Sequence, residues 1–244
     1  MGRRMIVLFC FIWGIGCITL LCILANADLD SDYSLPDESA IVFAPAEQKE
    51  ITFPVPLQGT DLIVRGIYPY DGAFWEDGSG CLVTGVAAIL VENAGSYGIE
   101  KANIVVGQGD RLLKFDCTTI PPGAQVVILE RNKSGFSRDR VKYCFGSQRL
   151  QLEGWDLSVV SWESPDIATL CLTNVTDSPI YGVELLYKDH LQGMYVGGAT
   201  NSYYIEELLP GETIQITPKR FAGGVSKILC ILTDINAIDK KSVA

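Results

Sequence analysis

The sequence contains a single histidine, His190, among its 244 residues. A nucleophilic triad needs an imidazole beside a serine or cysteine, and no serine lies in a G-x-S-x-G motif. One imidazole cannot build a multi-histidine zinc site, and the cysteines form no C-x-x-C pair. We interpret His190 as a loop residue and expect a non-enzymatic protein with no catalytic, cofactor or metal site.

Helical periodicity is also missing, because no window sustains it for three turns. Short β-branched segments instead recur between Gly, Pro and Asn residues. In one of them Ala102, Ile104 and Val106 alternate with other residues, which predicts a strand with one buried face. The segment Gly107–Asp110, "GQGD", reads as the turn of a hairpin. Such spacing favours an all-β sandwich of antiparallel sheets.

The chain repeats one pattern of landmarks in the same order. The pairs are Trp75 with Trp155, Asn93 with Asn174, Ile99 with Ile180, Pro122-Gly123 with Pro210-Gly211, and Cys144 with Cys230. The second copy has additional residues in its middle, a place we interpret as a lengthened loop. Self-similarity of this kind indicates a duplicated unit. We therefore expect two tandem immunoglobulin-like β-sandwich domains, one over residues 41–148 with extra N-terminal edge strands and one over residues 149–244.

The N-terminal segment, residues 1–27, has few charged residues. Arg3 and Arg4 precede an uncharged apolar run, and Ala27 ends a small-x-small triplet, a pattern typical of a signal peptide. The run is also long enough to span a bilayer as a helix, so a retained membrane anchor is the alternative. In both cases the positive charges stay inside, which predicts a secreted or membrane-anchored, extracytoplasmic protein.

Basic residues are the minority, and the net charge is −10. Residues 28–40 are acidic and interrupted by Ser and Pro, as expected of a flexible linker. An acidic chain repels phosphate backbones and anionic lipid, so we expect no nucleic acid partner and membrane contact only through the N-terminal segment. An envelope or surface protein, or a cell-wall polysaccharide, is the expected partner; calcium or a cationic polymer is the alternative that the charge leaves open.

Five cysteines follow the N-terminal segment, an odd number for an oxidising compartment. Two intramolecular disulfides at most would form. The pairs compatible with the strand pattern are Cys117–Cys144 or Cys81–Cys144 in the first copy and Cys171–Cys230 in the second. Buried free thiols are the alternative, because the second copy lacks counterparts of Cys81 and Cys117.

One stretch, "GIYPYDGAFWEDGSG", concentrates aromatic side chains among Pro, Gly and acidic residues. Tyr68, Tyr70, Phe74 and Trp75 would form a recognition loop if their rings are exposed, since exposed rings stack on sugars or fill a partner's pocket. The match of Trp75 with Trp155 favours structural packing instead. A carbohydrate-binding module acting through this loop is the alternative function.

The order of landmarks resembles the FxLYD-type immunoglobulin-like modules of bacterial envelope proteins. It shares a strand ending in Asn and a polar turn, an alternating strand, a Pro-Gly turn and a closing strand, over roughly residues 73–231. The F-x-L-Y-D signature itself is missing, and no catalytic residues carry over. The resemblance implies an exported or membrane-tethered protein of the cell envelope whose modules serve interaction or spacing.

Overall fold

The computed structural model describes residues 51–219 and 224–233, which belong to one compact unit of the chain. The expected signal or anchor (1–27) and linker (28–40) lie outside these residues. All regular secondary structure in the described part is β, which confirms the all-β prediction. No helix that could span a membrane is found among these residues.

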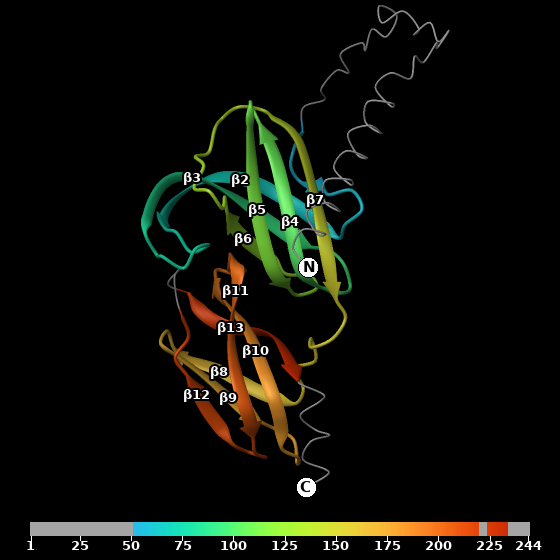
Figure 1. Cartoon of the computed structure of the whole chain (residues 1–244), viewed down its shortest axis with the longest axis vertical. Coiled ribbons are helices and arrows are strands. Elements are labelled where there is room, and N and C mark those ends of the chain that lie inside the picture. Colours follow the sequence, from blue (N-terminus) through green and yellow to red (C-terminus); the bar gives the residue numbers. More distant parts are fainter. Residues whose placement is uncertain (1–50, 220–223, 234–244) are drawn as a thin grey trace, which may run out of the picture. The chain divides into compact units, whose positions relative to one another are not determined.

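The described residues form thirteen strands (Figure 1). Their bounds are β1 Val55–Pro56, β2 Leu62–Ala73, β3 Leu82–Asn93, β4 Gly98–Gln108, β5 Arg111–Ile120, β6 Gln125–Leu129, β7 Val141–Gln151, β8 Val160–Asp166, β9 Thr169–Asn174, β10 Ile180–Leu191, β11 Met194–Leu208, β12 Thr213–Ile216 and β13 Val225–Thr233. The expected hairpin turn is confirmed, since Gln108 pairs with Arg111 and leaves Gly109 and Asp110 at the tip.

These strands assemble into three sheets. The largest has seven strands in the order β1-β2-β3-β6-β11-β10-β13, and two smaller sheets have the orders β5-β4-β7 and β12-β9-β8. Neighbouring strands are antiparallel except β6 and β11, which are parallel. We call β1 to β7 the earlier strands and β8 to β13 the later strands. In the seven-stranded sheet the two sets meet only at the parallel pair β6 and β11.

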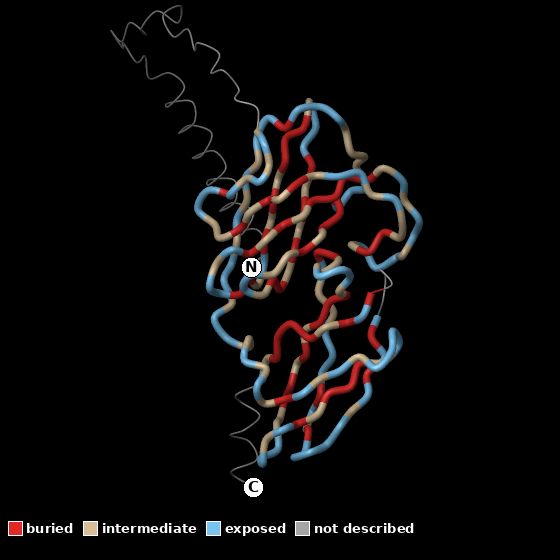
Figure 2. Tube along the Cα trace, turned by 180° about the vertical axis from the view of Figure 1, so that it is seen from behind, coloured by how far each residue is buried: buried red, intermediate tan, exposed pale blue. Residues whose placement is uncertain are grey.

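The earlier and later strands are connected in the same way. Strands β2, β3 and β6 are neighbours, as are β8, β9 and β12, while β5-β4-β7 corresponds to β11-β10-β13. Each set has its own hydrophobic cluster, one around Ile89, Ile104 and Phe115 and another around Leu172 and Leu185. Figure 2 shows the buried residues concentrated along the strands in both sets. Apolar side chains that alternate along each strand account for both clusters.

Two buried asparagines occupy corresponding places in the two sets. Asn93 ends β3, and its side-chain amide donates to the carbonyl four residues further on (2.8 Å) and to that of Ile120 (3.1 Å). Asn174 ends β9, and its amide donates to the carbonyl four residues further on (2.9 Å) and to that of Leu208 (2.9 Å). Ile120 and Leu208 are the last residues of β5 and β11. Each asparagine thus satisfies backbone acceptors that its turn leaves unpaired.

The two tryptophans that the sequence pattern aligns do not correspond. Trp75 lies between β2 and β3, whereas Trp155 lies between β7 and β8, ahead of the strand that corresponds to β2. The indole of Trp155 donates to the carbonyl of Gln151 (2.8 Å) and lies against Gly98, where a Cβ atom would overlap its ring. The predicted correspondence of Trp75 with Trp155 was wrong, because the two residues match in sequence spacing but lie at different places in the strand order.

Candidate functional site

The extra residues of the second copy lengthen two strands rather than a loop. Strands β10 and β11 have 12 and 15 residues, compared with 11 and 10 in the corresponding β4 and β5. The added part of β11 carries Tyr195 and Val196, which pair with Val126 and Val127 of β6. His190 consequently lies in β10 and not in a loop, which corrects the sequence interpretation.

A buried lysine lies beside this contact. Lys188 is on β10, and its ammonium donates to the carbonyls of Gly197 (2.7 Å) and Gly198 (2.6 Å) on β11. It also approaches the thiol of Cys117 on β5, with 3.7 Å between Nζ and Sγ. Burial lowers the pKa of Lys188, and the neighbouring Cys117 and Glu76 act in the opposite direction. The lysine therefore links the later strands to the earlier ones.

A carboxylate reaches the same backbone segment from the other side. Glu76 follows β2 and accepts from the amides of Gly198 (2.8 Å) and Leu129 (2.8 Å) and from the indole of Trp75 (3.0 Å). Burial raises the pKa of Glu76, although these bonds and the charge of Lys188 oppose the shift. The peptide group between Gly197 and Gly198 thus donates its N–H to the Glu76 carboxylate and accepts at its carbonyl from the Lys188 ammonium. Such charge-assisted bonds are stronger than neutral ones.

Two threonines complete the contact between the strand sets. The hydroxyls of Thr118 on β5 and Thr200 on β11 are 2.9 Å apart, and the Thr200 amide donates to the Thr118 hydroxyl (3.1 Å). Gly198 lies so close to β5 that a Cβ atom would collide with the Asp116 carbonyl. We call this group the junction cluster; it comprises Glu76, Cys117, Thr118, Lys188, Gly197, Gly198 and Thr200.

A groove of about 600 Å³ borders the junction cluster at Thr118 and Thr200, and we call it the seam groove. Its lining comes from both strand sets: Glu100, Thr118, Thr119, Leu150, Gln151, Leu152 and Glu153 from the earlier residues, and Glu184, Leu186, Thr200, Ser202 and Leu232 from the later ones. Leucine side chains and carboxylates dominate this surface. Pockets at the boundary between two packed parts of a protein, here the two strand sets, are frequent binding sites.

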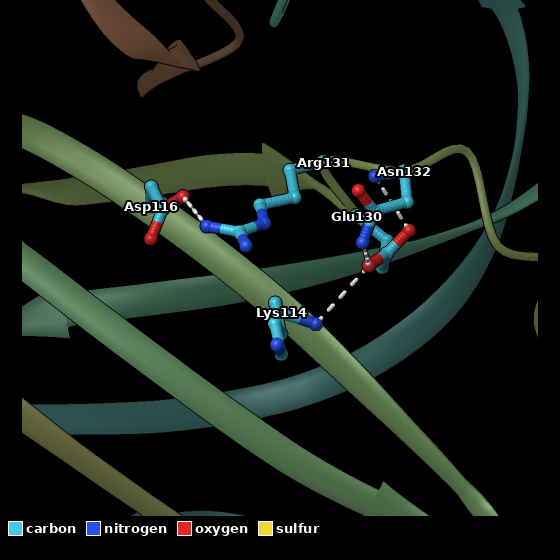
Figure 3. Close-up of polar contacts among 5 residues, drawn as sticks. All are labelled: Lys114, Asp116, Glu130, Arg131 and Asn132. Atoms are coloured by element: carbon cyan, nitrogen blue, oxygen red, sulfur yellow. Dashed lines mark hydrogen bonds and ion pairs between the residues drawn. The ribbon is translucent and has the colours of Figure 1, made fainter.

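A smaller cavity of about 200 Å³ lies beside Glu76, Cys117 and Gly198. At its edge Arg131 forms an ion pair with Asp116 at 3.0 Å (Figure 3). This pair is exposed and contributes little to stability.

The loop after β6 is held by a fully buried carboxylate. Glu130 accepts from the amides of Lys114 (3.2 Å), Asn132 (2.9 Å) and Ser134 (2.8 Å), and Figure 3 shows how its side chain meets the first two residues. A buried carboxylate requires such donors. We therefore assign Glu130 a structural role.

The predicted recognition loop is mostly buried. Phe74 is inaccessible and Trp75 is only 8% exposed. Tyr70 is half-buried and meets the Trp75 ring edge-on at 4.6 Å between centroids, which leaves Tyr68 as the exposed ring. The burial of Phe74 and Trp75 agrees with structural packing, the interpretation that the sequence favours, because this loop folds back onto β11 and places Glu76 in the junction cluster.

None of the predicted disulfides is formed, since Cys81, Cys117, Cys144, Cys171 and Cys230 are all free thiols. Cys117 pairs across from Ala102 and Cys144 from Val106, on opposite sides of β4. Two strand spacings, about 9.5 Å, already exceed the reach of a disulfide. This corrects the disulfide prediction and leaves the alternative of free thiols.

Cys81 differs from the other described cysteines because it is exposed. Its thiol lies 3.3 Å from the ammonium of Lys133, which is itself paired with Asp77 at 2.9 Å. Hydrogen bonds from Ser79 and Lys133 lower the pKa of Cys81. Its thiolate is therefore the most accessible of these sulfur nucleophiles.

An exposed aromatic pair on β7 was not singled out from the sequence. Tyr143 and Phe145 are 41% and 55% exposed, and their rings are nearly parallel with centroids 5.9 Å apart. The Tyr143 ring covers Gly107 of β4, where a side chain would collide with it. The signal was present in "RVKYCF", because residues two apart on a strand share one face.

Other chemistry is sparse in the described residues, which contain no group of three or more His, Cys, Asp or Glu side chains able to hold a metal ion. His190 contacts the ring of Tyr195 and lies 3.3 Å from Lys227, and burial lowers its pKa. No family model matches the chain, and a search of curated proteins found no relative.

Proposed function

We propose that this chain is an exported or membrane-tethered, non-enzymatic protein of the cell envelope. In it, two tandem immunoglobulin-like sandwiches act together as an interaction or spacing module. The matching strand order of the two sets and their separate hydrophobic clusters support the duplicated fold. The acidic charge and the N-terminal pattern support the location.

The observation that carries the proposal is the junction cluster. Two domains joined by a linker normally move relative to one another unless their interface is extensive. Here a parallel strand contact, three charge-assisted bonds to the backbone of Gly197 and Gly198, and a threonine pair hold the two strand sets together. A fixed angle between two sandwiches suits a protein that presents a surface at a set distance from a membrane.

The test is expression of the full chain with its own leader, followed by cell fractionation and affinity capture from envelope extract. We expect the chain in the envelope or exported fraction, together with a specific partner in near-stoichiometric amount. Recovery of the chain only from the cytosol contradicts the location. Turnover of an ester, peptide or glycoside that is lost in His190→Ala contradicts the non-enzymatic assignment.

The stacked rings of Tyr143 and Phe145 favour carbohydrate binding as a second candidate function. Flat exposed rings on a strand can pack against the apolar face of a sugar. The full chain would then sediment with insoluble cell-wall polysaccharide, and Phe145→Ala would abolish this binding. The control is Leu152→Ala, which removes a similarly exposed apolar side chain away from the ring pair. Equal sedimentation of both variants contradicts this candidate.

A further inference from the structure

We propose that the seam groove binds a short extended peptide of a partner protein, in which a lysine or arginine lies between aliphatic residues. The inference rests on the proposed interaction function and names the chemistry of the ligand. The groove has about 600 Å³, which is within the range of about 300–1,000 Å³ of ligand sites. The groove lies between two strand sets that the junction cluster already holds together. Little of the protein therefore has to become ordered when a ligand binds.

Charge complementarity determines the central residue of the ligand. Glu100, Glu153 and Glu184 contribute carboxylates to the lining, which contains no lysine or arginine. Arg149 pairs with Glu100 from outside the groove, so Glu153 and Glu184 supply most of the remaining negative charge. A cleft lined by one sign of charge concentrates ligands of the opposite sign. An acidic peptide would be repelled by these carboxylates and by the net charge of −10.

Apolar surface determines the flanking residues. Leu152 is 72% exposed and Leu150 38% exposed, and Leu186 and Leu232 extend the apolar lining from the later strands. Exposed leucines grouped around a concave surface mark an interaction site rather than a random apolar surface. Aliphatic side chains on both sides of the cation would cover these leucines.

Hydroxyl groups distinguish a peptide from a simple polyamine. Thr118, Thr200 and Ser202 contribute hydroxyl groups to the lining. These hydroxyls can donate to or accept from a peptide backbone. A polyamine carries the cation but neither branched aliphatic groups nor backbone amides, and it would leave the leucines exposed. A peptide segment satisfies all three parts of the lining.

The experiment measures binding of end-blocked Leu-Lys-Leu and Leu-Gln-Leu peptides to the full chain by calorimetry. We expect the lysine peptide to bind at least about tenfold more tightly, because its ammonium can form charge-assisted bonds with the carboxylates of the lining. Glu184→Gln should weaken its binding about tenfold, and added salt should weaken it further. Glu163→Gln is the matched control, because Glu163 lies on β8 outside the groove, and it should bind as the parent does.

Glu153→Gln provides a second variant whose folding is not in question, since Glu153 is exposed and lies outside the strands. Absence of binding overturns the proposal, as does equal affinity for the two peptides or for spermidine. Unchanged affinity in both Glu184→Gln and Glu153→Gln also overturns it. If the chain still captures an envelope partner in these cases, the proposed function stands and only the assignment of the groove fails.

Discussion

Replacement of Lys188 by methionine tests whether the junction cluster holds the two strand sets together. Methionine keeps an unbranched side chain of similar length but removes the ammonium that binds the carbonyls of Gly197 and Gly198. Those buried acceptors would lose their donor, and Glu76 would lose its nearest compensating charge. Removal of one partner from a buried ionic group costs about 3–5 kcal/mol.

Part of that loss is offset, because the unfolded state no longer has an ammonium whose hydration must be given up on folding. We therefore expect Lys188→Met to lower the free energy of unfolding by about 3 kcal/mol. For a slope of about 1–3 kcal/mol per molar urea, the midpoint of unfolding should fall by about 1 M or more. Urea titration of the full chain followed by tryptophan fluorescence measures this shift.

The control is Lys101→Met, because Lys101 is exposed on β4, and its effect should stay within about 0.5 kcal/mol. Glu76→Gln combined with Lys188→Met should show a coupling of at least about 1 kcal/mol, since both residues bind the peptide group between Gly197 and Gly198. A Lys188→Met variant as stable as the parent would refute the reasoning. It would mean that desolvation of the ammonium outweighs its bonds.

Three further predictions concern other described residues. Asn93→Ala and Asn174→Ala each leave buried carbonyls without a donor and should each reduce stability by about 2–3 kcal/mol in urea titrations; a loss at one site alone would show that the two asparagines are not equivalent. Cys81 should react with iodoacetamide faster than the other described cysteines, because its pKa is lowered while burial raises the pKa of Cys144 to about 12 and that of Cys230 to about 11. Peptide mass spectrometry should show slower labelling in Lys133→Met, and unchanged labelling would exclude the influence of that ammonium. Because the pKa of Glu76 is raised above 4.5, the folded chain retains a proton just above this pH that the unfolded chain has released, so stability falls as the pH rises through that window. Urea midpoints across the window should fall less steeply in Glu76→Gln, and an equal slope would contradict the assignment.

Local features of the fold could be predicted from the sequence. The alternation at Ala102, Ile104 and Val106 gave a strand whose inner face is buried, as the structure confirms. Asn93 and Asn174 could be expected to end strands, because asparagine tolerates a left-handed turn and bonds its own backbone, and both do end strands. These signals are short-range and depend on the period of a strand and the chemistry of its turn.

The junction could not be predicted in the same way. The contact of Tyr195 with Val126 joins residues far apart in the chain through a pairing of two residues on each strand, too short to leave a periodic pattern. Nothing in the sequence marks Lys188 as buried, since a lysine is seldom buried without partners, and only tertiary structure supplies these. The sequence favoured packing for Trp75 but could not identify β11 as the strand that it packs against.

The greater length of β11 has a consequence for how two strand sets of matching order avoid misassembly. Adjacent units of similar sequence tend to exchange strands during folding, a common failure of repeat proteins. Strand β11 has 15 residues and its counterpart β5 only 10, so the two hairpins are not interchangeable. This difference in hairpin length distinguishes the two strand sets, and the longer strand β11 is the one that pairs with β6.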